Sequence, residues 1–374
     1  MIFFNGHLFK QFMRFLVKST FKLQSLALAA ILLFATFIMS CEGPAGKDGL
    51  AGGAGKDGKD GNATCGACHN SGSKLVSRAN EYDLSLHGKG EAFMDANRGG
   101  CAACHTSEGY LETAVTGADT TVTNGFANPS TIGCRTCHNI HKAYDSTDWK
   151  FTSVAPYTFR YGNHKDNADL KNANLCARCH QARVLSPVID ETKATVKITS
   201  LRWGPHYGGQ SNMLLAQSGF SLDGTALPSS QAHKNIDGAC FQCHMRSPLG
   251  LLVGGHTFNT AAYDELTGKR SAQGTAGCLS STCHTSIDAN WNPDKGSVVT
   301  NILADMASVK TKLMAKGWID STNYVVATTA KPLELSIADA KLLADYLVVT
   351  RDKGSFAHNP KYAAALLKQC LAKL

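Results

Sequence analysis

The sequence predicts a mainly α-helical fold with long loops, minimal β-structure and a helical C-terminal segment. The chain is rich in glycine and poor in aromatic side chains, with 35 glycines among its 374 residues and 8% aromatics. Short cysteine motifs recur through residues 63–290 and interrupt any long periodic pattern. After residue 297 apolar residues instead recur at helical spacing, which predicts amphipathic helices.

The cysteines of this chain are organised in pairs. Twelve of the fourteen form six pairs, each followed at once by a histidine; five pairs read C-x-x-C-H and the sixth reads C-x-x-x-x-C-H. The paired residues are Cys65 and Cys68, Cys101 and Cys104, Cys134 and Cys137, Cys176 and Cys179, Cys240 and Cys243, and Cys278 and Cys283. The histidines that follow them are His69, His105, His138, His180, His244 and His284.

C-x-x-C-H is the attachment motif of c-type haem. Two thiols must reach the two vinyl groups on one edge of the porphyrin, and residues three apart share one face of a helical turn. The next histidine can then reach the iron as its proximal ligand. Neither a disulfide scaffold nor a zinc ribbon requires a histidine after every second cysteine. We therefore predict six haem c groups, with two extra residues looped out in the C-x-x-x-x-C-H motif.

The remaining histidines are candidates for the second, distal iron ligands. Apart from the proximal histidines and His7, seven remain, one more than six bis-histidine irons need. His141 lies three residues after His138 on the same helical face, so we expect it to ligate a neighbouring iron. Two others lie in glycine-rich turns, where backbone can approach a flat cofactor closely. The seven are His87, His141, His164, His206, His233, His256 and His358, of which His206 and His256 are those in the turns.

Residues 63–290 contain all six motifs. So little chain per haem predicts that the haems themselves form the core, wrapped in short helices and loops and stapled by thioethers. Residues 291–374 contain no haem motif. Three helices are expected there, one from Val298 to about Leu313, one from about Ser336 to Thr350 and one from Pro360 to the end. They are expected to pack on the haem domain, with a partner-binding surface as the alternative, and Cys370 as a buried small hydrophobe.

Residues 1–40 are typical of a targeting segment. Four basic residues and no acidic residue precede an apolar run at 26–39, which ends at Ser40-Cys41. This pattern predicts a lipoprotein-type signal peptide, cleaved before a lipidated Cys41; an uncleaved membrane anchor is the alternative, although the run is short for a span. Residues 41–62 carry a collagen-like glycine at every third position from Gly43 to Gly61. They predict a flexible tether, with a trimeric stalk as the alternative.

Four segments resemble exported multihaem c-type cytochromes related to cytochrome c nitrite reductase and the octahaem reductases. The segments are Cys240-Phe-Gln-Cys243-His244-Met245, Trp203-Gly-Pro-His206-Tyr-Gly-Gly-Gln210, Gly255-His256-Thr-Phe and His358-Asn-Pro-Lys-Tyr362. The resemblance covers about residues 63–374. It implies stacked pairs of haems and favours His206, His256 and His358 as distal ligands. The chain lacks the C-x-x-C-K motif of a nitrite reductase and has six motifs instead of eight, so the resemblance does not imply reductase activity.

These observations favour electron transfer over catalysis. The net charge of +8 falls to about +4 without the four basic residues of the leader, and haem propionates would make the protein acidic, which argues against nucleic-acid binding. We expect an exported, membrane-anchored protein, facing the periplasm or the cell surface, that exchanges electrons with other redox proteins. Two alternatives stay open: a reductase of a nitrogen or sulfur oxyanion, with an open iron at the C-x-x-x-x-C-H motif, and the subunit of a cytochrome filament.

Overall fold

A computed structural model describes residues 65–66, 69, 74–118, 121, 124–161, 167–236, 238–264 and 267–374, with backbone alone at 96, 97 and 167. All of these residues belong to one unit, Ala63–Leu374. The predicted signal peptide, Cys41 and the glycine repeat lie outside the described residues, as do Cys68 and His164.

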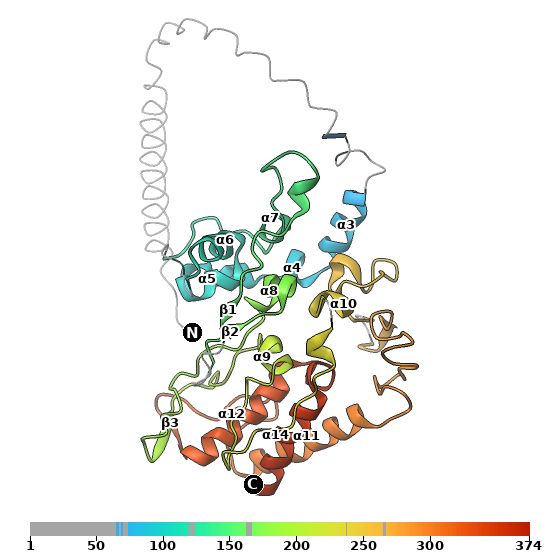
Figure 1. Ribbon diagram of the computed structural model, residues 1–374. Helices are drawn as coiled ribbons and strands as arrows, with labels where there is room; N and C mark the ends of the chain where they lie inside the picture. Colours follow the sequence, from blue (N-terminus) through green and yellow to red (C-terminus); the bar gives the residue numbers. More distant parts are fainter. Residues whose placement is uncertain are drawn as a thin grey trace, which may run out of the picture. The chain divides into compact units, whose positions relative to one another are not determined.

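Short helices separated by loops make up the described part of residues 63–290 (Figure 1). Several of these helices contain a predicted haem motif or overlap one in part. The α-helices are α3 (Lys74–Asp83), α4 (Leu86–Lys89), α5 (Gly99–His105), α6 (Ser107–Thr116), α7 (Cys134–Cys137), α8 (Asn174–Ala177), α9 (Gln210–Leu214) and α10 (Cys240–His244). The 3-10 helices are η1 (Ala92–Asn97), η2 (Ser146–Trp149), η3 (Lys171–Ala173), η4 (His233–Asn235) and η5 (Gly255–Thr257).

Strands are few and short in the described residues, as expected. They form three antiparallel pairs: β1 (Tyr157–Thr158) with β2 (Asn167–Ala168), β3 (Thr195–Ile198) with β6 (Leu333–Ser336), and β4 (Ala261–Tyr263) with β5 (Arg270–Gln273). The pairing of β3 with β6 places Val196 opposite Leu335. It therefore joins the region of the cysteine motifs to the C-terminal region.

The C-terminal region contains the three expected helices, α11 (Val298–Ala315), α12 (Ile337–Asp352) and α14 (Pro360–Lys373), with the short α13 (Ser355–His358) between the last two. Side-chain caps explain where two of them begin. The Ser336 hydroxyl accepts the Asp339 N–H at 3.1 Å, and the Asn359 side chain accepts the Tyr362 N–H at 3.3 Å ahead of Pro360. Leu303 follows the helical spacing of α11, but its side chain is 47% exposed.

An ordinary apolar core lies among these helices. Its fully buried side chains include Leu313, Leu343, Leu347 and Leu366, packed with Trp203 and Met213 from the region of the cysteine motifs. The C-terminal helices thus pack on that region, and Cys370 is confirmed as a fully buried small side chain. A smaller cluster forms around Tyr157, Phe159 and Leu170.

Candidate haem sites

A hollow of about 2130 Å³ lies among the short helices. Thiols, imidazoles and apolar side chains line it, which is the chemistry that a covalently attached porphyrin requires. The cysteines in its wall are Cys104, Cys134, Cys137, Cys176, Cys179, Cys240, Cys243, Cys278 and Cys283. The histidines in its wall are His87, His105, His138, His180, His206, His233, His244, His256, His284 and His358.

The cysteines are available for thioether bonds. Every cysteine that the structure describes is a free thiol. No group of three or more His, Cys, Asp or Glu side chains in the described part of the chain is arranged to hold a conventional metal ion.

Each predicted proximal histidine faces one candidate distal histidine. The ring centroids lie 5.9–6.4 Å apart in all six pairs. A metal–imidazole bond is about 2 Å long, so one iron between two rings separates their centroids by about 6 Å. The pairs are His69 with His141, His180 with His87, His105 with His206, His138 with His256, His284 with His233, and His244 with His358.

The pairing bears on two of the expectations from the sequence. His141 faces His69 at 5.9 Å and not the histidine of its own motif, as the three-residue spacing implies. His284, the histidine of the C-x-x-x-x-C-H motif, faces His233 at 6.1 Å. That geometry gives no support to an open iron at this motif. His164 belongs to none of these pairs, and it lies outside the described residues.

Hydrogen bonds orient the rings of five of the six predicted proximal histidines. The Nδ1 atoms of His105, His138 and His244 lie 3.0, 2.7 and 2.9 Å from the backbone oxygens of Ala92, Trp149 and Phe258. An Nδ1–H that donates to a carbonyl leaves Nε2 unprotonated and oriented for iron. His180 Nδ1 instead forms a hydrogen bond with the Gln210 side-chain oxygen at 3.1 Å. His284 Nδ1 forms one with an Asp294 carboxylate oxygen at 2.7 Å.

Burial favours the iron-binding form of two distal histidines. Desolvation lowers the pKa of His87 to about 4 and, together with the positive charge of Arg183, lowers the pKa of His206 to about 4. Both rings are therefore neutral at ordinary pH, and neutral imidazole is the form that ligates a metal.

An acidic residue that the sequence analysis missed shapes the loop of His141. The Asp148 carboxylate accepts the backbone N–H groups of residues 141–144 at 2.7–3.2 Å. His141 itself has a φ of 62°, in the left-handed region, and these four hydrogen bonds stabilise the turn that carries it. No spacing rule distinguishes Asp148 from other acidic residues in the sequence.

A second missed residue, Glu81, holds the turn of His256. Its carboxylate is 2% exposed, accepts the His256 backbone N–H at 2.8 Å and pairs with Arg78 at 2.8 Å. Gly255 has a φ of 54°, and a Cβ there would lie 2.3 Å from a Glu81 oxygen. The glycine expected to permit close approach of a cofactor therefore permits, in addition, close approach of Glu81.

Cysteines of different motifs lie side by side. The neighbouring thiols are those of Cys104 and Cys179, of Cys176 and Cys240, and of Cys243 and Cys278. Four of the six motifs are thus joined in one series, in the order 101–105, 176–180, 240–244 and 278–284. Motifs adjacent in this series have adjacent attachment points.

Comparisons with known proteins give one structural likeness. No protein-family model and no curated protein sequence matches the chain. The crystal structure of outer cell wall cytochrome OcwA is similar to 79% of this chain at 19% sequence identity, with a TM-score of 0.46. This chain covers 50% of that structure, so it spans about half of its length. The relation to cytochrome c nitrite reductase stays a prediction.

Proposed function

We propose that this chain is an exported electron-transfer protein that binds six haem c groups, each ligated by two histidines. The six facing histidine pairs carry the proposal, because their spacing of 5.9–6.4 Å accommodates one iron per pair. An iron with imidazole on both sides has no free position for a substrate. The geometry therefore favours an electron carrier over an oxyanion reductase.

The residues around the hollow suit that role. Haem iron, when bound, takes up and releases one electron by cycling between Fe(III) and Fe(II). Neighbouring cysteines such as Cys176 and Cys240 would hold the edges of successive porphyrins close together. Apolar side chains exclude water from the rings and help to set their potentials. The series of adjacent motifs then provides a route for electrons between redox partners.

The N-terminal sequence supports a place for this activity at the cell envelope. A lipid on Cys41 and the tether at 41–62 would hold residues 63–374 at a membrane face, periplasmic or extracellular. None of the helices in the described ranges is both long and apolar enough to cross a bilayer.

Haem content and spin state test the proposal together. We expect the purified, oxidised holoprotein to contain six haems per chain, by pyridine haemochrome assay and intact mass. Low-temperature EPR should show low-spin signals alone, since two imidazoles give a strong ligand field. A high-spin signal from one haem per chain would contradict closed coordination and direct attention to nitrite, hydroxylamine and tetrathionate as substrates. Fewer than six haems would contradict the cofactor assignment.

A further inference from the structure

Two of the ligand histidines differ from the others in what their Nδ1 atoms contact. His284 Nδ1 lies 2.7 Å from the Asp294 carboxylate, and His358 Nδ1 lies 2.8 and 3.0 Å from the two Asp352 oxygens. The other Nδ1 partners described above are neutral carbonyl or amide oxygens. Carboxylates also lie near His105 and His256, but Asp95 and Glu81 are 3.9 and 3.7 Å away, beyond hydrogen-bond distance.

Asp294 is held with one oxygen directed at His284. Its other oxygen accepts the Thr285 N–H at 2.7 Å and the Thr285 hydroxyl at 2.9 Å. An aspartate carboxylate is ordinarily an anion at neutral pH, so the contact of Asp294 with His284 is charge-assisted.

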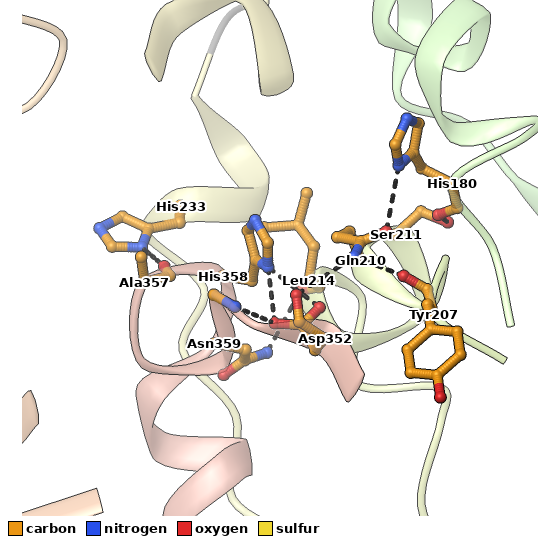
Figure 2. Close-up of polar contacts among 11 residues, drawn as sticks. His180, Tyr207, Gln210, Ser211, Leu214, His233, Asp352, Ala357, His358 and Asn359 are labelled. Atoms are coloured by element: carbon orange, nitrogen blue, oxygen red, sulfur yellow. Dashed lines mark hydrogen bonds and ion pairs between the residues drawn. The ribbon is translucent and has the colours of Figure 1, made fainter. Parts of the chain in front are cut away.

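Asp352 lies at the end of α12, where Figure 2 shows its side chain directed at His358. Its side chain is fully buried and its carboxylate also accepts the Gly354 N–H at 3.2 Å. The Asp352 backbone oxygen accepts a hydrogen bond from the Gln210 side-chain amide at 3.1 Å. The side-chain oxygen of Gln210 in turn contacts His180 Nδ1. The backbone oxygen of Ala357, in the same segment, accepts from His233 Nδ1 (Figure 2). Residues 352–358 thus contact ligand histidines of two pairs directly and reach His180, of a third pair, through Gln210.

We propose that Asp294 and Asp352 are positioning residues that make the His284–His233 and His244–His358 sites the lowest-potential pair in the chain. This inference rests on the proposed bis-histidine ligation. A hydrogen bond to a carboxylate gives an imidazole partial imidazolate character and makes it a stronger donor to iron. A stronger donor and a nearby negative charge both stabilise Fe(III) relative to Fe(II), which lowers the potential.

The two sites are also neighbours. A Cβ at Gly277, the residue before Cys278, would lie only 2.9 Å from the Cα of Cys243, so the attachment points of the two motifs adjoin. Two adjacent low-potential sites form one end of the series of motifs. With haems bound, electrons that enter at this end would move toward sites whose histidines have neutral partners, each one-electron oxidation being matched by a one-electron reduction at the next iron.

The test is a potentiometric titration of the holoprotein and of the variants Asp294→Asn and Asp352→Asn. Asparagine keeps the shape and an acceptor oxygen but removes the charge. We expect one of the six midpoint potentials to move positive in each variant, a different one in each, with a change in the EPR g-values of one low-spin haem. Asp294→Glu should restore the wild-type potential at least in part.

Asp95→Asn is the matched control, since Asp95 lies beyond hydrogen-bond distance of His105. It should shift the potential of the His105 site less than Asp294→Asn shifts that of the His284 site, because it removes a nearby charge but no hydrogen bond to the ligand histidine. Unchanged potentials in both Asp294→Asn and Asp352→Asn, with six low-spin haems retained, would overturn this inference and leave the proposed function intact. Wild-type protein with a missing or high-spin haem would instead overturn the proposed function, and this inference with it. Asp294 is 46% exposed, so its variant tests the inference even if Asp352→Asn loses haem.

Discussion

Replacing His358 by alanine is expected to convert one of six low-spin haems into a high-spin haem. His358 faces His244 at 6.4 Å and is the histidine placed opposite it in the described structure. Alanine would leave that iron with imidazole on one side alone, a weaker ligand field and a free position. Low-temperature EPR and CO binding to the reduced protein would measure the change, and added imidazole should reverse it.

His164→Ala is the control for this prediction. The six facing pairs use six of the seven candidate distal histidines, so the count leaves His164 without an iron to ligate. All six haems should stay low-spin in that variant. A fully low-spin His358→Ala protein, or a high-spin signal from His164→Ala, would show that the distal ligands are assigned wrongly.

Leu343→Ala should cause a large loss of stability, as expected for truncation of a fully buried core leucine. Leu343 lies on α12 and is fully buried in the apolar core. Removing a leucine side chain from such a position costs about 2–5 kcal/mol of unfolding free energy, from lost burial and the cavity left behind. Chemical denaturation followed by far-UV circular dichroism, at unchanged haem content, would measure it.

Leu303→Ala on α11 makes the same chemical change at a side chain that is 47% exposed. It should alter the free energy of unfolding by no more than about 0.5 kcal/mol. Equal losses in the two variants would mean that the C-terminal helices do not form the regular core described above.

The prediction of the haem cysteines and proximal histidines rests on chemistry that is local in the sequence. Two thioethers and one iron bond must come from one helical turn, which imposes a fixed spacing. The helices α11, α12 and α14 could be predicted for a similar reason, since their apolar repeat and the caps at Ser336 and Asn359 are local signals. Their helical positions leave the exposure of a single side chain such as Leu303 undetermined, because that depends on which neighbours cover it.

The histidine pairs could not be predicted in the same way. The tertiary fold brings together pairs such as His87 with His180 and His138 with His256. The residues that flank each histidine do not identify its partner. The counting argument gave a set of seven candidates without their pairing. The sequence analysis missed Asp148, Asp294 and Asp352 because a single acidic residue forms no recognisable sequence pattern. The role of each depends on which N–H group the tertiary fold places beside its carboxylate.

The order of the facing pairs along the chain has a topological consequence. The intervals 69–141, 87–180, 105–206, 138–256 and 244–358 overlap one after another, and 233–284 overlaps the last of these as well. Irons between the rings would close each interval into a loop that shares a stretch of chain with the next. A protease nick within any loop would then yield two fragments that migrate as one particle under native conditions. For the same reason, no haem-bearing portion of the chain could be excised as a separate module without opening a neighbouring loop.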